Sequence, residues 1–400
     1  MSLTNKPEPK KVPKSEQTHF TETDDGITFD NARFKTPAPL AKDWSALFER
    51  FGLDQDEFEL EPGSAVRMGS WDQSSRQGGE RDFVQLYSFR AHFRRRAARP
   101  ISDEEVEERA RALRSFRPSR VKPRKNAGDR VAAVINLADF QASKAEGGGI
   151  DGLTRRLTDG LENVQSWIDR LRASYNLEEV IIVNNGDAIE GCAGNYASQM
   201  FTVGMNHRQQ YNYVLDMWDL YARTLFPQFE YRQFVSVLSN HGEMGRLGAA
   251  KNQTGDSDSA DGFLAEALKR VYDATPSFSD VEWTIPHDEM NVFTETRQGV
   301  KLAFNHGHKI PGSDASGFEK WLSSQVRGCR DAWEADIWTT AHRHNFQAWD
   351  LGSCSVFQCP SMDGGSKWLR DSTGRYSTSG ILAYVVGKHS KLKWSDMAFL

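Results

Sequence analysis

VAAVINLAD, residues 131–139, is an apolar run with a single polar residue, Asn136, and it ends in an aspartate. A run without polar alternation is typical of a parallel strand that is covered on both faces. The pattern returns at 180–187, where VIIV is followed by NNGD, and at 234–240, where FVSVL is followed by SN. Residues with helical spacing at 153–171 separate the first two runs. Alternating strands and helices predict an α/β domain.

The remaining segments continue this alternation. Three further helices are expected, at about 205–226, 259–271 and 315–328. Strand-like segments are expected near 281–285, 290–296, 300–304 and 336–340. Residues 126–400 are therefore predicted to form the main domain.

The amino-terminal part differs in composition from this domain. Residues 1–30 are predicted to be a flexible tail, because their start, MSLTNKPEPKKVPKSEQ, is polar and lacks the apolar core of a signal peptide. Residues 31–125 are predicted to be a small α+β region. Its helix should run from about Trp44 to Phe51, and its strands should include Phe83 to Phe89. We place the domain boundary near residue 125.

The charge of the chain is concentrated in one segment. Between Arg90 and Lys125, thirteen Arg or Lys residues and five Asp or Glu residues give a net charge of +8, although the whole chain carries −5. Ser102 and Glu105 match a capping box, which predicts a short helix, and 117–125 is expected to be a basic linker. Such a segment is either a solvated helix and linker or a surface that binds the phosphate backbone of DNA or RNA.

Several classes of protein are disfavoured by composition. No stretch approaches the roughly 20 consecutive apolar residues of a membrane helix, so no membrane partner is expected. The four cysteines form no C-x-x-C pair and no zinc-ribbon spacing, so we expect reduced thiols in a cytoplasmic protein. They are Cys192, Cys329, Cys354 and Cys359.

Polar residues that can bind divalent cations follow five of the predicted strands. They are Asp139, Asp187, Asn240, His306 and His342. In open α/β sheets, ligands bind outside the carboxyl ends of the strands, so these residues can meet although they are far apart in the sequence. Two carboxylates, an amide oxygen and imidazoles, without a thiolate, suit borderline-hard divalent cations. The sequence therefore predicts a metal site at this edge.

The order of these motifs resembles that of the calcineurin-like metallophosphoesterase superfamily. The family has D-x-H, G-D-x-x-D/E, G-N-H-D/E, a single His and G-H-x-H. The corresponding residues here are Asp139-Phe140-Gln141, Gly186-Asp187-Ala188-Ile189-Glu190, Asn240-His241, His306-Gly307-His308 and Ala341-His342-Arg343-His344. The resemblance covers roughly residues 130–360. It implies a two-sheet β-sandwich flanked by helices, in α-β-β-α order, and it makes 126–400 the catalytic domain.

The resemblance implies two divalent metal ions and a place for each ligand. Asp187 would bridge the two metals, because one carboxylate between two cations relieves their repulsion. The other ligands would be Asp139 and His344 at the first metal and Asn240, His306 and His342 at the second. Mn²⁺ is the metal expected first, with Mg²⁺, Fe or Zn²⁺ as alternatives. A hydroxide held between the metals would attack phosphorus in line.

The resemblance also implies roles around the metals. His241 would act near the leaving oxygen as general acid or as a stabilising cation, and Glu190 would orient it. His308 is a candidate substrate contact, with a role behind the ligands as the alternative. Arg343 would contact the phosphate or pair with a surface acid. Lys144 lies either in a loop that approaches the phosphate or in a plain loop.

Two positions depart from the family pattern. Gln141 stands where the family has a histidine, and we predict that it is a weak ligand that favours Mn²⁺ or Mg²⁺. The competing interpretation is that Gln141 does not bind metal and that the enzyme is slow or has a single metal. In the third motif, Ser239 replaces the usual glycine and Gly242 separates His241 from the acid. The ligand and the histidine are retained there.

The predicted function is metal-dependent hydrolysis of phosphodiester bonds. The basic segment favours nucleic acid as the substrate, as in repair-exonuclease-like or bacteriophage-encoded members of the superfamily, the latter acting in the host cytoplasm. One alternative is a small-molecule nucleotide phosphatase or phosphodiesterase. The other is a non-catalytic nucleic-acid-binding protein with a decayed metal site, for which Gln141 would be the sign.

Overall fold

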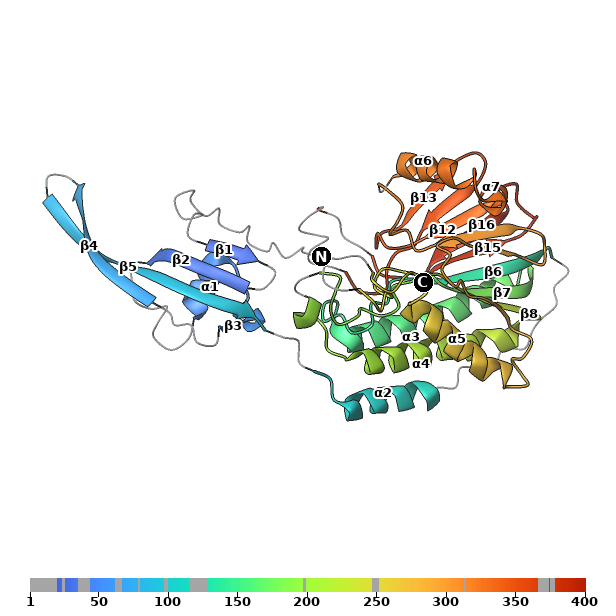
Figure 1. Cartoon of the computed structure of the whole chain (residues 1–400), viewed down its shortest axis with the longest axis horizontal. Coiled ribbons are helices and arrows are strands. Elements are labelled where there is room, and N and C mark those ends of the chain that lie inside the picture. The colour runs from blue at the N-terminus through green and yellow to red at the C-terminus, as the bar shows by residue number, and fades with distance from the viewer. Residues whose placement is uncertain are drawn as a thin grey trace. The chain divides into compact units, whose positions relative to one another are not determined.

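The protein is described here from a computed structural model. The described residues are 20–23, 26–34, 44–61, 67–77, 80–96, 100–115, 128–196, 199–246, 252–312, 314–365, 374 and 378–400. The chain divides into two compact units, Met1–Ala97 and Ala98–Leu400. Each unit has a hydrophobic core of its own. Figure 1 shows the helices and strands of each unit.

In its described residues, the first unit is a five-stranded antiparallel sheet with one α-helix. The strand order is β1-β2-β5-β3, and β4 pairs with β5. The strands are β1 (Phe20–Thr23), β2 (Gly26–Phe34), β3 (Phe58–Leu60), β4 (Arg67–Gln77) and β5 (Glu80–Arg95). The helix α1 (Ser45–Phe51) packs Phe48 edge-on against Phe29 and Phe93 of the sheet. This apolar cluster is the core of the unit.

The structure corrects the extent of the predicted flexible tail. β1 and the first half of β2 lie within residues 1–30, because Ile27 and Phe29 are buried in the core of the first unit. Residues 1–19 lie outside the described residues.

The second unit contains two sheets. The six-stranded sheet has the order β16-β15-β6-β7-β8-β9, in which β6 to β9 are parallel. Its strands are β6 (Arg130–Leu137), β7 (Asn176–Asn184), β8 (Tyr231–Ser236), β9 (Glu282–Thr284), β15 (Leu382–Val386) and β16 (Trp394–Phe399). The five-stranded sheet has the order β10-β11-β12-β14-β13, with β11, β12 and β14 parallel. Its strands are β10 (Val292–Glu295), β11 (Lys301–Asn305), β12 (Ile337–Thr340), β13 (Gln347–Asp350) and β14 (Ser355–Gln358).

The two sheets face each other and helices cover their outer faces (Figure 1). Along β6, Val131, Ala133 and Ile135 join the cluster beneath the helices, while Ala132 and Val134 join the cluster between the sheets. Successive side chains of a strand point to opposite faces, and both faces of β6 are covered, which explains why Val131 to Ile135 are all apolar. The predicted α-β-β-α sandwich is confirmed.

The helices divide between the two outer faces. The six-stranded sheet is covered by α3 (Gly149–Leu171), α4 (His207–Leu225) and α5 (Ala260–Asp273). The five-stranded sheet is covered by α6 (Ala315–Gln325) and α7 (Arg330–Glu334). No helix among the described residues is both long and apolar enough to cross a membrane.

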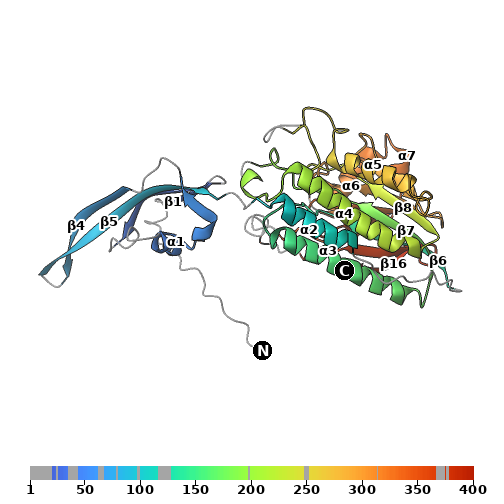
Figure 2. The same cartoon turned by 90° about the horizontal axis from the view of Figure 1, so that it is seen from below.

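A further helix, α2 (Asp103–Ser115), belongs to the second unit, so the boundary lies at residue 97 rather than near 125. The predicted capping box is confirmed, since Ser102 N donates to Glu105 Oε2 at 2.9 Å and Glu105 N donates to Ser102 Oγ at 3.2 Å. Leu113 is buried in the core beneath the helices, and Arg114 is paired with Asp216 of α4 at 3.0 Å. Figure 2 shows α2 alongside α4.

Shortening the chain tests this boundary. We expect residues 98–400 to fold with an undiminished free energy of unfolding for the second unit. A chain of residues 126–400 should lose about 3 kcal/mol or more, because burying one large aliphatic side chain is worth roughly 1.5–3 kcal/mol and α2 buries several apolar groups. Urea denaturation followed by tryptophan fluorescence measures both values. Equal stability of the two shortened chains would show that α2 is dispensable.

Candidate metal centre

Five loops at the carboxyl ends of parallel strands carry the predicted metal ligands. Asp139, Asp187 and Asn240 follow β6, β7 and β8 of one sheet. His306 and His342 follow β11 and β12 of the other sheet. The two sheets therefore contribute to one site, as expected for ligands outside the carboxyl ends of strands.

These loops have an unusual backbone. Asp139 and Asp187 each have a φ of 50°, and His342 and His344 have φ values of 71° and 55°. Gln141, with a φ of 43°, lies in the same loop as Asp139. A non-glycine residue in this left-handed region costs roughly 1–3 kcal/mol, and such residues cluster at functional sites. The turns aim consecutive side chains into one small volume.

The side chains form two groups that could each hold a metal ion. The first group is Asp139, Asp187 and His344, and the second is Asp187, His306 and His342. Within each group, one potential ligand atom per residue lies within 4.8 Å of the others. Asp187 belongs to both groups, which is the bridging position that the family resemblance implies.

Asn240 completes the second group. Its Oδ1 lies 3.2 Å from His306 Nε2, and that same nitrogen lies 3.1 Å from Asp187 Oδ2. His306 Nδ1 donates to the carbonyl oxygen of Asn185 at 2.8 Å, so Nε2 is the nitrogen that faces the ligand group. Hydrogen bonds behind a ligand histidine set its tautomer and orientation in this way.

Asp363 orients His344 and had no role in the sequence analysis. His344 Nδ1 donates to Asp363 Oδ2 at 3.1 Å, which leaves Nε2 at 3.3 Å from Asp139 Oδ1. Asp363 is 2% exposed and accepts a further hydrogen bond from Ser361 Oγ at 2.5 Å. Asp363 follows β14, which is parallel to β12 and ends at the same edge of the sheet, so its place in the sequence could have indicated a role in the site.

The buried carboxylates fit bound cations. Asp139 Oδ1 and Asp187 Oδ2 are buried, and the polar groups that face them are His344 Nε2 at 3.3 Å and His306 Nε2 at 3.1 Å. Burial would raise the pKa of Asp187, but His306 and the neighbouring histidines hold it well below the usual range. Burial would lower the pKa of His306 and His344, but Asp187 raises that of His306 to about 9, and Asp363 and Asp139 raise that of His344 to about 10. Two protonated histidines thus balance the carboxylates where metal ions would otherwise do so.

His241 and Glu190 lie together beside the ligand groups. His241 Nδ1 donates to the main-chain carbonyl of Glu190 at 2.8 Å, and the Glu190 carboxylate lies 3.5 Å from the same nitrogen. His241 N donates to Asp187 Oδ1 at 3.0 Å, which ties this loop to the shared carboxylate. Tyr196 donates its hydroxyl to Glu190 Oε1 at 2.5 Å. Burial raises the pKa of Glu190.

Gln141 lies in the site with its amide oxygen directed toward Lys144 and its amide nitrogen directed toward His241. Its Oε1 accepts a hydrogen bond from Lys144 Nζ at 3.0 Å, and its Nε2 lies 3.5 Å from His241 Nε2. Lys144 is held by Asp363, whose Oδ2 lies 2.6 Å from Nζ. The carboxamide oxygen, which is the atom that could bind a metal, is therefore used by Lys144.

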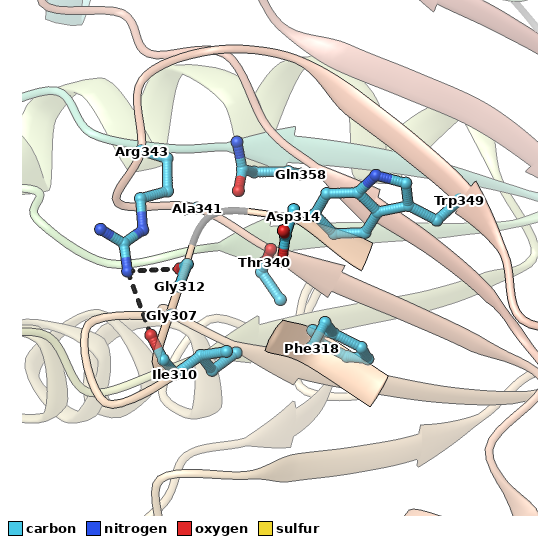
Figure 3. A pocket seen from close by; sticks show the side chains of 10 residues that line it. All are labelled: Gly307, Ile310, Gly312, Asp314, Phe318, Thr340, Ala341, Arg343, Trp349 and Gln358. Carbon is cyan, nitrogen blue, oxygen red and sulfur yellow. Dashed lines mark hydrogen bonds between the residues drawn. The ribbon is translucent and has the colours of Figure 1, made fainter. Parts of the chain in front are cut away.

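The two candidate substrate contacts lie in different surroundings. Neither ring nitrogen of His308 has a hydrogen-bond partner in the described part of the chain, and the ring packs 5.4 Å from His306 and 6.2 Å from His342. Arg343 instead donates to the carbonyls of Ile310 (3.0 Å) and Gly312 (2.8 Å), beside a cavity of about 20 Å³ (Figure 3). That volume suits a water molecule rather than a substrate. Arg343 thus fixes the loop after His306.

Comparisons with known proteins give only distant likenesses. No family model matches the chain, and no curated protein matches it. Three solved structures are similar over 67% of this chain. Vps29 from Entamoeba histolytica in complex with Zn²⁺ is 12% identical, covered over 98% of its length, with a TM-score of 0.29. An archaeal phosphodiesterase is 12% identical, covered over 99%, with a TM-score of 0.29. A hypothetical protein from Pyrococcus horikoshii is 10% identical, covered over 88%, with a TM-score of 0.34. Likenesses this weak carry no information on activity.

Asp363→Asn tests the hydrogen bond behind His344. We expect Mn²⁺ binding at the first position to weaken by roughly 10–100-fold, because outer partners of ligand histidines have effects of this size. Calorimetric titration of metal-free protein measures the change. The control is Asp350→Asn, which alters an exposed carboxylate at the end of β13 that accepts from Gly352 N. If both variants and the wild type bind Mn²⁺ with equal affinity, Asp363 does not contribute to metal binding.

Metal binding should release protons at pH 7.5. The raised pKa values of His306 and His344 keep both rings protonated in metal-free protein, so two ligated metals would displace about two protons. For the same reason, these rings stabilise metal-free protein below their ordinary pKa of about 6.5, and that stabilisation is lost as the pH rises through 9 to 10. Titrations in buffers of different ionisation enthalpy count the protons. A binding heat that is independent of the buffer would mean that both rings are neutral.

Proposed function

We propose that the protein is a dinuclear metal-dependent phosphoesterase that hydrolyses phosphodiester bonds. The observation that supports this most is that Asp187 is shared by the two groups of ligand side chains. We also propose that the chain is a member of the calcineurin-like metallophosphoesterase superfamily, and the order of the motifs in the sequence supports this. Mn²⁺ is the metal that we expect first.

Bound divalent metals would neutralise charge on the phosphoryl group and lower the pKa of the attacking water. The chain's own residues would do the rest. Asp187 Oδ1 accepts from the main-chain N–H of His241, and His241 Nδ1 donates to the Glu190 carbonyl. His241 Nε2 is then the nitrogen left to face a leaving oxygen, where a proton donor is needed. The Tyr196 hydroxyl keeps the Glu190 carboxylate in place behind it.

Nucleic acid is the substrate class that we propose, and it rests on the basic segment from Arg90 to Lys125. Several of its arginines are ion-paired within the chain. The pairs are Arg90–Asp30 at 2.7 Å, Arg95–Glu57 at 2.8 Å, Arg109–Asp151 at 2.7 Å and Arg114–Asp216 at 3.0 Å. An arginine that is already paired with a carboxylate adds less net positive charge to a phosphate-binding surface. The support therefore comes chiefly from residues 117–125, which lie outside the described residues.

Hydrolysis of a bis-aryl phosphate diester tests the proposed activity. Metal-stripped protein resupplied with Mn²⁺, Mg²⁺ or Zn²⁺ should turn the diester over. Asp187→Asn should abolish turnover because it removes the charge shared by both positions, and His241→Ala should lower kcat by roughly 10²–10⁴-fold. The control is His389→Ala, since His389 contacts Ser395 away from the centre and should leave turnover unchanged.

Labelled single- and double-stranded DNA in the same assay tests the substrate class. Cleavage that weakens steeply with salt supports the nucleic-acid proposal. Turnover of mononucleotides without DNA cleavage would favour the small-molecule alternative. Folded, metal-loaded protein that turns over no phosphoester would overturn the proposed function and favour the binding-protein alternative.

A further inference from the structure

We propose that Gln141 is a hydrogen-bond donor on the substrate side of the centre, not a metal ligand, and that Lys144 sets it in this role. The inference rests on the proposed function, because it names which residues contact the phosphoryl group. It also gives Gln141 a role that differs from metal binding, which is the role that the family resemblance implies for a histidine at this position.

The first step concerns the direction of the Gln141 amide. Lys144 has a side chain that is only 10% exposed, and its Nζ lies 2.6 Å from Asp363 Oδ2 and 3.0 Å from one end of the Gln141 carboxamide. An ammonium group can only donate hydrogen bonds, so the end of the carboxamide that meets it has to be the oxygen. Asp363 is buried and fixed by Ser361, which holds Lys144 and hence the amide in place.

The second step concerns the other end of the amide. The Gln141 NH₂ group lies 3.5 Å from His241 Nε2. His241 Nδ1 faces the Glu190 carbonyl, which can only accept, so Nδ1 carries a hydrogen and Nε2 is the nitrogen on the side of Gln141. Lys144 therefore sets the direction of the Gln141 amide, and the NH₂ group lies on the side of the His241 ring that faces away from Glu190.

Two consequences follow for the centre. A metal bound to Gln141 Oε1 would have to displace Lys144 or share an atom 3.0 Å from its positive charge. The first position therefore has three protein donors, and the second has four. Those of the first are Asp139, Asp187 and His344, and those of the second are Asp187, Asn240, His306 and His342. The Gln141 N–H bonds lie beside the His241 nitrogen that faces the substrate, where a phosphoryl oxygen would accept from them.

Two titrations test the assignment, and neither depends on turnover. In the first, Mn²⁺ is titrated into metal-free wild type and Gln141→Ala. In the second, inorganic phosphate is titrated into the Mn²⁺-loaded proteins. We expect both Mn²⁺ affinities of Gln141→Ala to stay within about twofold of wild type and phosphate binding to weaken about tenfold or more, as for a lost hydrogen bond to a charged group. A tenfold loss of Mn²⁺ affinity, or unchanged phosphate binding, would overturn the proposal.

Gln141→Glu provides a second variant of the same size that keeps a partner for Lys144. It replaces the NH₂ group by an anionic oxygen, so phosphate binding should weaken at least as much as in Gln141→Ala. Phosphate affinity equal to that of wild type would contradict a donor at this position. Thermal melting of each variant shows that it is folded before it is titrated.

Lys144→Met tests the positioning role of Lys144. Without the ammonium the amide can turn, so phosphate binding should weaken, and Gln141→Ala should add nothing further in the double variant. A purely structural lysine would give additive losses instead, and that result would overturn the role of Lys144. The matched control is Lys393→Met, which removes another ion-paired lysine, 2.5 Å from Asp336, and should leave phosphate binding unchanged.

The two proposals fail in different ways. Wild-type protein that binds no Mn²⁺, or Asp187→Asn that binds it as wild type does, overturns the metal centre and with it the inference on Gln141. Normal Mn²⁺ binding together with phosphate affinity that is insensitive to Gln141 overturns the inference alone.

Discussion

The centre depends on one buried carboxylate, that of Asp187. It is 1% exposed, and its Oδ2 lies 3.1 Å from His306 Nε2. A buried charge is costly unless positive charge lies next to it. His306 supplies that charge when it is protonated, and a divalent cation would supply it after displacing the proton. The need to balance Asp187 therefore couples metal binding, proton release and the orientation of His241, whose main chain donates to the same carboxylate.

The fold satisfies this requirement by bringing loops from both sheets to one edge. The turns are strained, with left-handed φ angles at Asp139, Asp187, His342 and His344. Strain of this kind persists only where the surroundings fix the backbone. Here the fixing groups are main-chain bonds between loops, such as Asp139 N to the Gly186 carbonyl at 3.0 Å. The stability of the sandwich thus maintains a geometry that the loops would not adopt by themselves.

The sequence was sufficient for the sandwich and for the meeting of the ligands. Apolar runs such as 131–135 are typical of buried strands, and a polar residue that follows such a strand is expected at the sheet edge. It was insufficient for Asp363 and Lys144, whose roles depend on a contact between residues that are 219 positions apart in the sequence. The extent of the amino-terminal tail was missed because β1 has only four residues and the apolar residues Ile27 and Phe29 of β2 alternate with polar ones. The boundary near 125 was inferred from charge, whereas the docking of α2 depends on the few apolar residues of its inner face.

Ser239 and Gly242 form the second departure from the family pattern, and both positions are adapted to the same oxygen of Asp261. Ser239 Oγ donates to Asp261 Oδ2 at 2.5 Å and accepts from Gly242 N at 3.2 Å. A Cβ atom at position 242 would lie only 2.2 Å from the same Asp261 oxygen, so glycine is needed to leave room for it. Asp261, in α5, is 1% exposed, and burial raises its pKa to about 6. The Ser239 hydroxyl, which a glycine would lack, thereby ties the loop that carries Asn240 and His241 to a helix of the core.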